Sequence, residues 1–208
     1  ATDWARLTVG RQHVSLDDER FIGIVDFRQN QQTYDALTVG LELPANVAVD
    51  AGYIWRVNRI FGPRSSLGRF RGDSYYINVN APIPHGRLTL FRYALDLSTN
   101  TPTRPTVPLS SQTTGARLDG WYYGDALSLE WTASFAAQQD YADNSSEFSA
   151  RYWLVEGRAG FDDWDLTLRA ESLGGDGETA FQTPLATLHK FQGATDVFLQ
   201  TPPEGVLD

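Results

Sequence analysis

Apolar and polar residues alternate along most of the chain, which is the pattern of β-strands with two unlike faces. In residues 33–43 the apolar set is Leu37, Val39, Leu41 and Leu43, and every residue between them is small or polar. Residues 127–138 and 164–171 repeat this alternation. Each of these segments is therefore expected to form a strand with one apolar and one polar face.

The same reading predicts about nine strands of roughly nine to twelve residues. The facing is ambiguous in residues 147–158, because Phe148, Ala150, Tyr152 and Leu154 form one set while Trp153 and Val155 are also apolar. The predicted strands cover residues 5–13, 33–43, 47–58, 73–81, 87–97, 115–124, 127–138, 147–158 and 164–171.

Short and long connections alternate in the middle of the chain. Short turns are expected at residues 44–46, 84–86, 124–125 and 161–163, and long loops begin near residues 59, 98 and 140. This rhythm is typical of an up-and-down meander with turns at one end and loops at the other, as in outer-membrane barrels.

A soluble β-sandwich also alternates with period two, so further features must decide. The strands are near the roughly 9 to 11 residues that cross a bilayer, and aromatic residues gather toward strand ends, as at residues 121–123. The polar faces carry Asp, Glu and Arg, and Lys190 is the only lysine beside sixteen arginines. These features favour an all-β, antiparallel, up-and-down transmembrane β-barrel over the sandwich.

Composition narrows the function. The net charge of −9 and the pI of about 4.7 argue against nucleic-acid binding, and the absence of cysteine excludes disulfides and thiolate metal sites. Because the chain starts with Ala1 and contains no methionine, we expect a processed chain or a segment of a longer one. No linker divides residues 1–208, so we expect a single β-barrel segment without separate domains.

The stretch "AFQTPLATLHKFQGATDVFLQTPPEG", residues 180–205, resembles the characteristic segment of the alginate-export family of bacterial outer-membrane β-barrels. The block "LTVGRQHVSLDDERFIGIVDFRQNQQTYDAL" and the short "VNRIFG" at residues 57–62 are similar to the family as well. The resemblance implies a central segment of a larger barrel in the bacterial outer membrane. It also implies passive conduction of a polymer or small anions, without cofactor or metal.

The stretch interrupted by Pro184 is then a long loop. In one placement it folds back toward the lumen or packs over a barrel mouth, and in the other it is an extracellular loop that only covers the rim. The sequence leaves both placements open. His189 and Lys190 are its candidate functional residues.

Passage of an anionic polysaccharide or small anionic solute needs a wet channel with fixed cations. Each candidate arginine could instead be neutralised by a neighbouring carboxylate in the wall. The predicted lumen residues are Arg11, Arg28, Arg56, Arg117, Arg151, Arg169, Glu130 and Glu171.

No catalytic, cofactor or metal site is expected, because no nucleophile motif is present and the three histidines are scattered. The expected partners are the outer-membrane bilayer and an anionic solute, with no nucleic acid. The alternatives are a soluble β-sandwich that binds carbohydrate through Trp121, Tyr122 and Tyr123, and a polysaccharide lyase or hydrolase.

Overall fold

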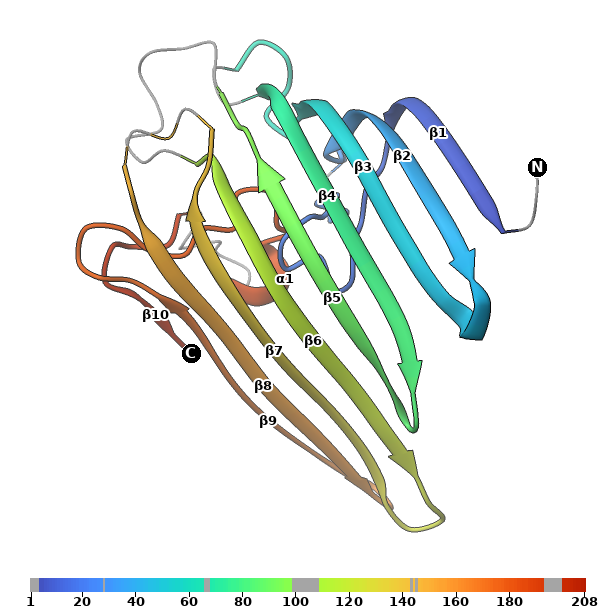
Figure 1. Cartoon of the computed structure of the whole chain (residues 1–208). Coiled ribbons are helices and arrows are strands. Elements are labelled where there is room, and N and C mark those ends of the chain that lie inside the picture. Colours follow the sequence, from blue (N-terminus) through green and yellow to red (C-terminus); the bar gives the residue numbers. More distant parts are fainter. Residues whose placement is uncertain are drawn as a thin grey trace.

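The chain forms one antiparallel sheet in which every strand pairs with its neighbour in sequence (Figure 1). This computed structural model describes residues 4–27, 29–65, 68–98, 109–142, 144, 146–192 and 200–208. The sheet order is β1 to β10, so β1 and β10 form its two edges. The strands are β1 Ala5–Gln12, β2 Thr33–Leu43, β3 Val47–Asn58, β4 Arg69–Ile83, β5 Gly86–Leu95, β6 Ser111–Tyr123, β7 Ser128–Asp140, β8 Ser149–Phe161, β9 Trp164–Gly174 and β10 Gly205–Leu207.

All nine predicted strands are present, and the up-and-down antiparallel fold is confirmed. The β4 strand is longer than predicted, beginning at Arg69 rather than Asp73, because its first residues pair with the end of β3. The short β10 was not predicted as a strand, since its three residues are recognisable only by their pairing with β9.

The outer face of the sheet is the apolar one. Register places Val39 of β2 beside Ala51 of β3 and Ala51 beside Ile77 of β4. Farther along the sheet, Phe135 of β7 pairs with Trp153 of β8. Exposed large apolar side chains cover this face, including Leu7, Val9, Leu37, Ile77, Leu90, Leu118, Trp131, Phe135, Trp153, Val155, Leu166 and Leu168. A continuous exposed apolar surface of this kind suits contact with lipid.

The two ends of the sheet differ. Tight turns join β2 to β3, β4 to β5, β6 to β7 and β8 to β9 at one end, whereas the longer connections lie at the other (Figure 1). We call these the short-turn end and the long-loop end. The short-turn connections include the 3-10 helix η1 Pro44–Asn46 and the turn at His85.

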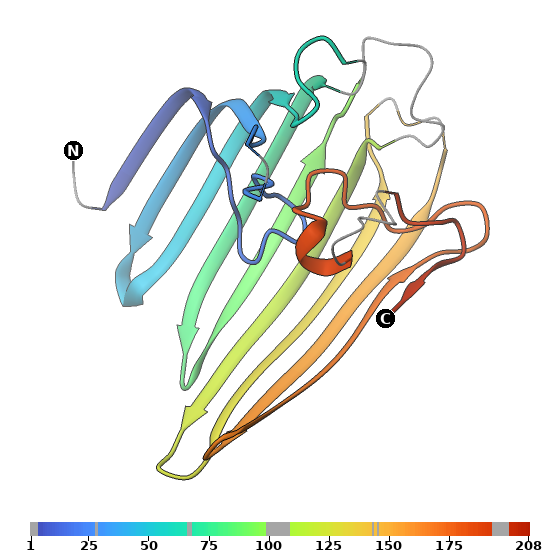
Figure 2. The same cartoon turned by 180° about the vertical axis from the view of Figure 1, so that it is seen from behind.

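Two segments far apart in sequence lie against the opposite, inner face (Figure 2). The first inward segment, residues 13–27 and 29–32, lies between β1 and β2, and the second, residues 175–192, follows β9 and ends in the short helix α1 His189–Gln192. They meet in a parallel bridge between Ile22 and Leu185, and the Gly23 amide donates to the Leu185 carbonyl over 2.9 Å. Gly23 is needed at this contact, because a Cβ there would lie 2.5 Å from Thr187 Oγ1.

The inward segments bury a small aromatic core on the inner face. Phe21 packs between Phe91 and Tyr152, with ring centroids 5.1 and 5.3 Å away, and Phe181 lies 5.5 Å from Tyr152. This contact settles the ambiguous facing of β8. Ala150, Tyr152 and Leu154 are buried beneath the inward segments, while Trp153 and Val155 belong to the outer face. Both faces of β8 are apolar here because each has an apolar neighbour.

Paired substitutions on β3 test the assignment of the outer face. Ala51→Arg places a guanidinium on the apolar face between Val39 and Ile77, and is expected to cost about 2–4 kcal/mol of unfolding free energy in a bilayer. Ala48→Arg is the matched control, because Ala48 faces inward beside Asp17 and Asp18. Denaturant titration in lipid vesicles measures both, and equal losses would contradict the assignment.

Candidate functional site

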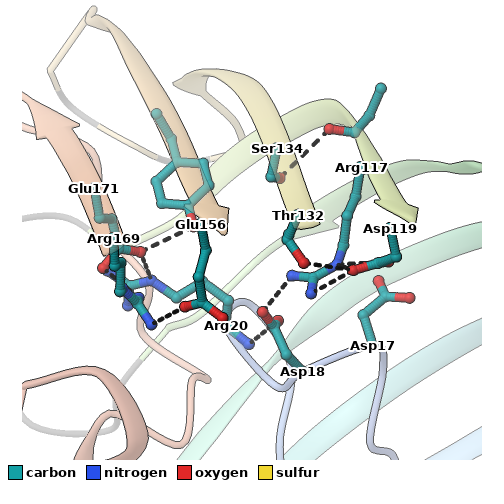
Figure 3. Close-up of polar contacts among 12 residues, drawn as sticks. Asp17, Asp18, Arg20, Arg117, Asp119, Thr132, Ser134, Glu156, Arg169 and Glu171 are labelled. Atoms are coloured by element: carbon teal, nitrogen blue, oxygen red, sulfur yellow. Dashed lines mark hydrogen bonds and ion pairs between the residues drawn. The ribbon is translucent and has the colours of Figure 1, made fainter. Parts of the chain in front are cut away.

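Charged side chains from β6, β8, β9 and the first inward segment meet on the inner face (Figure 3). Arg117 of β6 makes ion pairs with two carboxylates: Asp119 of its own strand, at 2.8 Å from Nη2 to Oδ1, and Asp18 of the first inward segment. Thr132 of β7 donates to Asp119 over 2.9 Å. Arg117 thus connects the barrel wall to a segment lying over it.

Glu171 of β9 is the centre of a second group of contacts. Its Oε1 accepts from Arg20 Nε at 2.6 Å and from the Tyr152 hydroxyl at 2.9 Å, and its Oε2 accepts from Arg169 at 3.0 Å. Arg169 also reaches Glu156 at 3.4 Å. Glu171 therefore uses both carboxylate oxygens and holds two guanidinium groups.

Arg20 is a buried cation. Its side chain is 1% exposed, and its partner Glu171 is 3% exposed. The guanidinium lies over the Phe191 ring at 4.7 Å and near the Tyr152 ring at 5.6 Å, so aromatic faces and one carboxylate replace its hydration. Arg20 was not among the predicted site residues, because residues 17–20 have the pattern of a polar turn and its partner is 151 positions away.

A further ion pair joins the two inward segments directly. Lys190 Nζ lies 2.8 Å from Glu19 Oε2, and Ser15 also donates to Glu19. Burial alone would raise the pKa of Glu19, but hydrogen bonds from Lys190, Thr187 and Ser15 outweigh it and hold that pKa below its ordinary value. The hydrogen bond to Glu19 in turn raises the pKa of Lys190. Both groups are charged at neutral pH.

We call the charged side chains labelled in Figure 3 the charged row. Carboxylates outnumber guanidinium groups in it. Arg20, Arg117 and Arg169 stand beside Asp17, Asp18, Asp119, Glu156 and Glu171. The alternative in which wall carboxylates neutralise the candidate arginines therefore describes Arg117 and Arg169 well. Within the described ranges, no cluster of His, Asp and Glu could hold a metal ion.

A polar groove adjoins the charged row on the inner face. Arg158 is an accessible cation there, since its pair with Asp165, at 3.0 Å, leaves its side chain 52% exposed. Tyr123 donates to Glu130 over 2.6 Å in the same region. The groove is lined by Arg87, Asp119, Gly120, Trp121, Tyr123, Glu130, Trp131, Thr132, Glu156, Arg158 and Thr167.

Half of the predicted lumen set lies on the inner face: Arg117, Arg169, Glu130 and Glu171. Lys190 and His189 are in α1, and His189 stacks on Phe27 with centroids 4.1 Å apart. The described part of the predicted loop, up to residue 192, lies on the inner face, where Phe181 packs against Tyr152, as in the first of its two predicted placements. Residues 193–199 of that loop lie outside the described residues. Arg28 lies outside the described residues.

The other three predicted lumen arginines face outward, which corrects the sequence-based facing. Arg151 lies on the same face of β8 as Trp153, and Arg11 lies on the same face of β1 as Val9. Arg56 was predicted on the wrong face because the register is irregular around residue 55. This irregularity shifts the alternation of β3 by one residue, so that Arg56 faces outward beside Asp35. These three belong to the long-loop end of the outer face.

Neither a family model nor a curated protein matches the sequence. The fold resembles OpdK, an outer-membrane protein of Pseudomonas aeruginosa, with a TM-score of 0.68 and 16% identity over 86% of this chain and 48% of that one. It is also similar to OccK8 (OprE) of the same organism, with a TM-score of 0.68 and 12% identity over 86% of this chain and 50% of that one. OccAB3 of Acinetobacter baumannii gives 0.64 and 14%, over 82% and 42%.

The fold is thus that of part of an outer-membrane β-barrel wall, and the chain spans about half the length of these proteins. The similarity supports the predicted outer-membrane location and does not support the alginate-export family in particular. Among the described residues, no helix has the length and hydropathy to cross a membrane.

Neutralising Glu171 tests whether its contacts hold the inward segments. Glu171→Gln leaves the buried Arg20 without a carboxylate, and we expect a loss of about 3–5 kcal/mol, with faster proteolysis of residues 13–32 and 175–192. Glu156→Gln is the control, because Glu156 is partly exposed and contacts only Arg169 among these groups. Equal protease resistance of the two variants would show that Glu171 is not the anchor.

Proposed function

We propose that this chain forms part of the wall of a larger outer-membrane barrel that passes small carboxylate-bearing solutes by diffusion. The observation that carries the proposal is the pairing of an apolar outer face with a charged inner face narrowed by two inward segments. A single sheet with an exposed apolar face also disfavours the β-sandwich alternative, in which a second sheet would cover that face.

The edges of the sheet support the larger barrel. β1 and β10 each pair on one side only within the described part of the chain. Unpaired backbone groups at a strand edge are costly in lipid, so further strands must complete the wall in the membrane.

Carboxylate preference rests on the arrangement of the arginines. A passing carboxylate can exchange with a wall carboxylate at an accessible guanidinium such as Arg158, since Asp165 is itself exposed. Alternating acids and bases would keep each encounter weak enough for release, which conduction requires. The structure of OpdK with vanillate shows an aromatic carboxylate with a channel of similar fold.

The sequence resemblance to alginate-export barrels points to a second member of the same chemical class, the uronates of an acidic polysaccharide such as alginate. Both solutes are carboxylates, so the inner-face arginines serve either. The proposal contains no catalytic step, and turnover of uronate polymers by the purified protein would contradict it.

Ion selectivity in a planar bilayer tests the channel. Arg117→Gln releases Asp18 and Asp119 from their shared cation, so the reversal potential in a salt gradient should move toward cation preference. A change of about 1 kcal/mol in the barrier would alter the permeability ratio roughly fivefold. Arg151→Gln is the matched control and should change nothing, because Arg151 faces outward.

Solute identity is tested on the same bilayer with vanillate or oligouronates on one side. Block of the ion current by one of them, weakened in Arg158→Gln, supports the carboxylate pathway and selects the solute. Stable conductance without block by either would remove the carboxylate assignment and keep the channel.

A further inference from the structure

The outer face carries its charges at one end only. Strand register places the outward-facing strand arginines at the long-loop end, just beyond the apolar band: Arg11, Arg56, Arg69, Arg71, Arg92 and Arg151. The outward-facing acids of the described strands are Asp35 and Asp73. Outward positions at the short-turn end hold apolar and aromatic residues instead, such as Leu43, Ile83, Tyr122, Phe161 and Trp164. We call the six arginines the arginine belt.

Arg11 and Arg56 are held in fixed positions by a shared acid. Arg11 donates to both oxygens of Asp35, at 2.7 and 3.1 Å, and Arg56 donates to Asp35 at 3.2 Å. Asn58 donates to the same carboxylate over 3.1 Å. Asp35 is buried beneath the two cations and neutralises only one of them, so the group presents a net positive charge outward.

Arg92 and Arg151 mark the belt farther along the sheet. They stand in one cross-strand row, in which Arg92 pairs with Thr114, Thr114 with Ala137, and Ala137 with Arg151. Arg92 donates to Gln112 over 2.7 Å, and neither arginine has a carboxylate partner in an ion pair within the described residues. Trp153 and Val155 follow Arg151 on the same face of β8, so the cation borders the apolar surface directly.

The position of the belt identifies its surroundings. In outer-membrane barrels the longer loops are extracellular, so an arginine between the apolar band and those loops lies at headgroup depth in the outer leaflet. Guanidinium groups bind phosphate in a bidentate manner, and arginine is favoured over lysine for such fixed contacts. A channel solute does not reach this face, because the wall separates it from the inner side.

We propose that the arginine belt binds the phosphate groups of a phosphorylated glycolipid in the outer leaflet. The glycolipid's acyl chains would cover the apolar band while its phosphates pair with Arg92, Arg151 and the Asp35-held arginines. The observation behind this assignment is charge complementarity confined to one end of an otherwise apolar surface. It is independent of which solute the channel passes.

Lipid displacement tests the proposal on the protein reconstituted in brominated phosphatidylcholine vesicles. Bisphosphorylated lipid A, added to the bilayer, should displace brominated lipid from the outer face and relieve quenching of outward tryptophans such as Trp153. Dephosphorylated lipid A should do so on the order of tenfold less effectively. The double variant Arg92→Gln/Arg151→Gln should lose most of this difference.

The control is Arg87→Gln/Arg158→Gln, which removes two arginines from the same two strands on the inner face and should keep the preference for phosphorylated lipid A. An unchanged preference in the outward double variant would overturn the proposal. If phosphatidylglycerol displaces the brominated lipid equally well, the glycolipid assignment is overturned. If inorganic phosphate in solution relieves the tryptophan quenching, the belt binds free phosphate and the glycolipid assignment is overturned as well. All four substitutions replace side chains at exposed positions, so both variants are expected to fold. Tryptophan emission without quencher verifies this.

Discussion

The rest of this structure depends on one constraint, which is that each strand must alternate between a face suited to lipid and a face suited to water. Side chains leave a strand on opposite sides in turn, so a shift of one residue would send a whole charged set into lipid. The register found here keeps Leu37, Val39 and Leu41 outside and their neighbours inside over the full length of β2. Once this register is set, the charged row, the groove and the arginine belt all have fixed sides.

The inner face solves a second problem, which is how to hold loose segments against a polar wall. A few strong, long-range contacts do so: the buried pair of Arg20 and Glu171 and the surrounding aromatic core. Gln138 of β7 adds two hydrogen bonds of 2.8 Å to the backbone of Gln182, one donated and one accepted. Because a buried Arg20 without its acid would be costly, the inward segments and the wall depend on each other.

The sequence predicted the strands, the meander and most of the facing, because a period of two is a local signal. It failed where an irregularity interrupts the alternation of a strand, and where both faces of a strand are apolar. The irregularity near residue 55 reversed the facing of Arg56, and apolar residues on both faces of β8 hid the outward position of Arg151. Arg20 could not be found at all, since only tertiary contact brings it to Glu171. The placement of the second inward segment likewise depends on contacts with β7 and the first segment.

The near absence of lysine acquires two separate explanations once the faces are known. On the inner face, Arg20, Arg117 and Arg169 each pair with one or more carboxylates in fixed geometry, which suits a planar guanidinium with several donors. On the outer face, Arg92 and Arg151 have no carboxylate partner among the described residues and stand next to the exposed apolar surface. One compositional bias therefore serves two purposes: fixed ion pairs on the inner face and, in the proposed arginine belt, an outward charge for an anionic headgroup. Lys190, the one exception, joins two segments by a single contact to Glu19, where one point charge is sufficient.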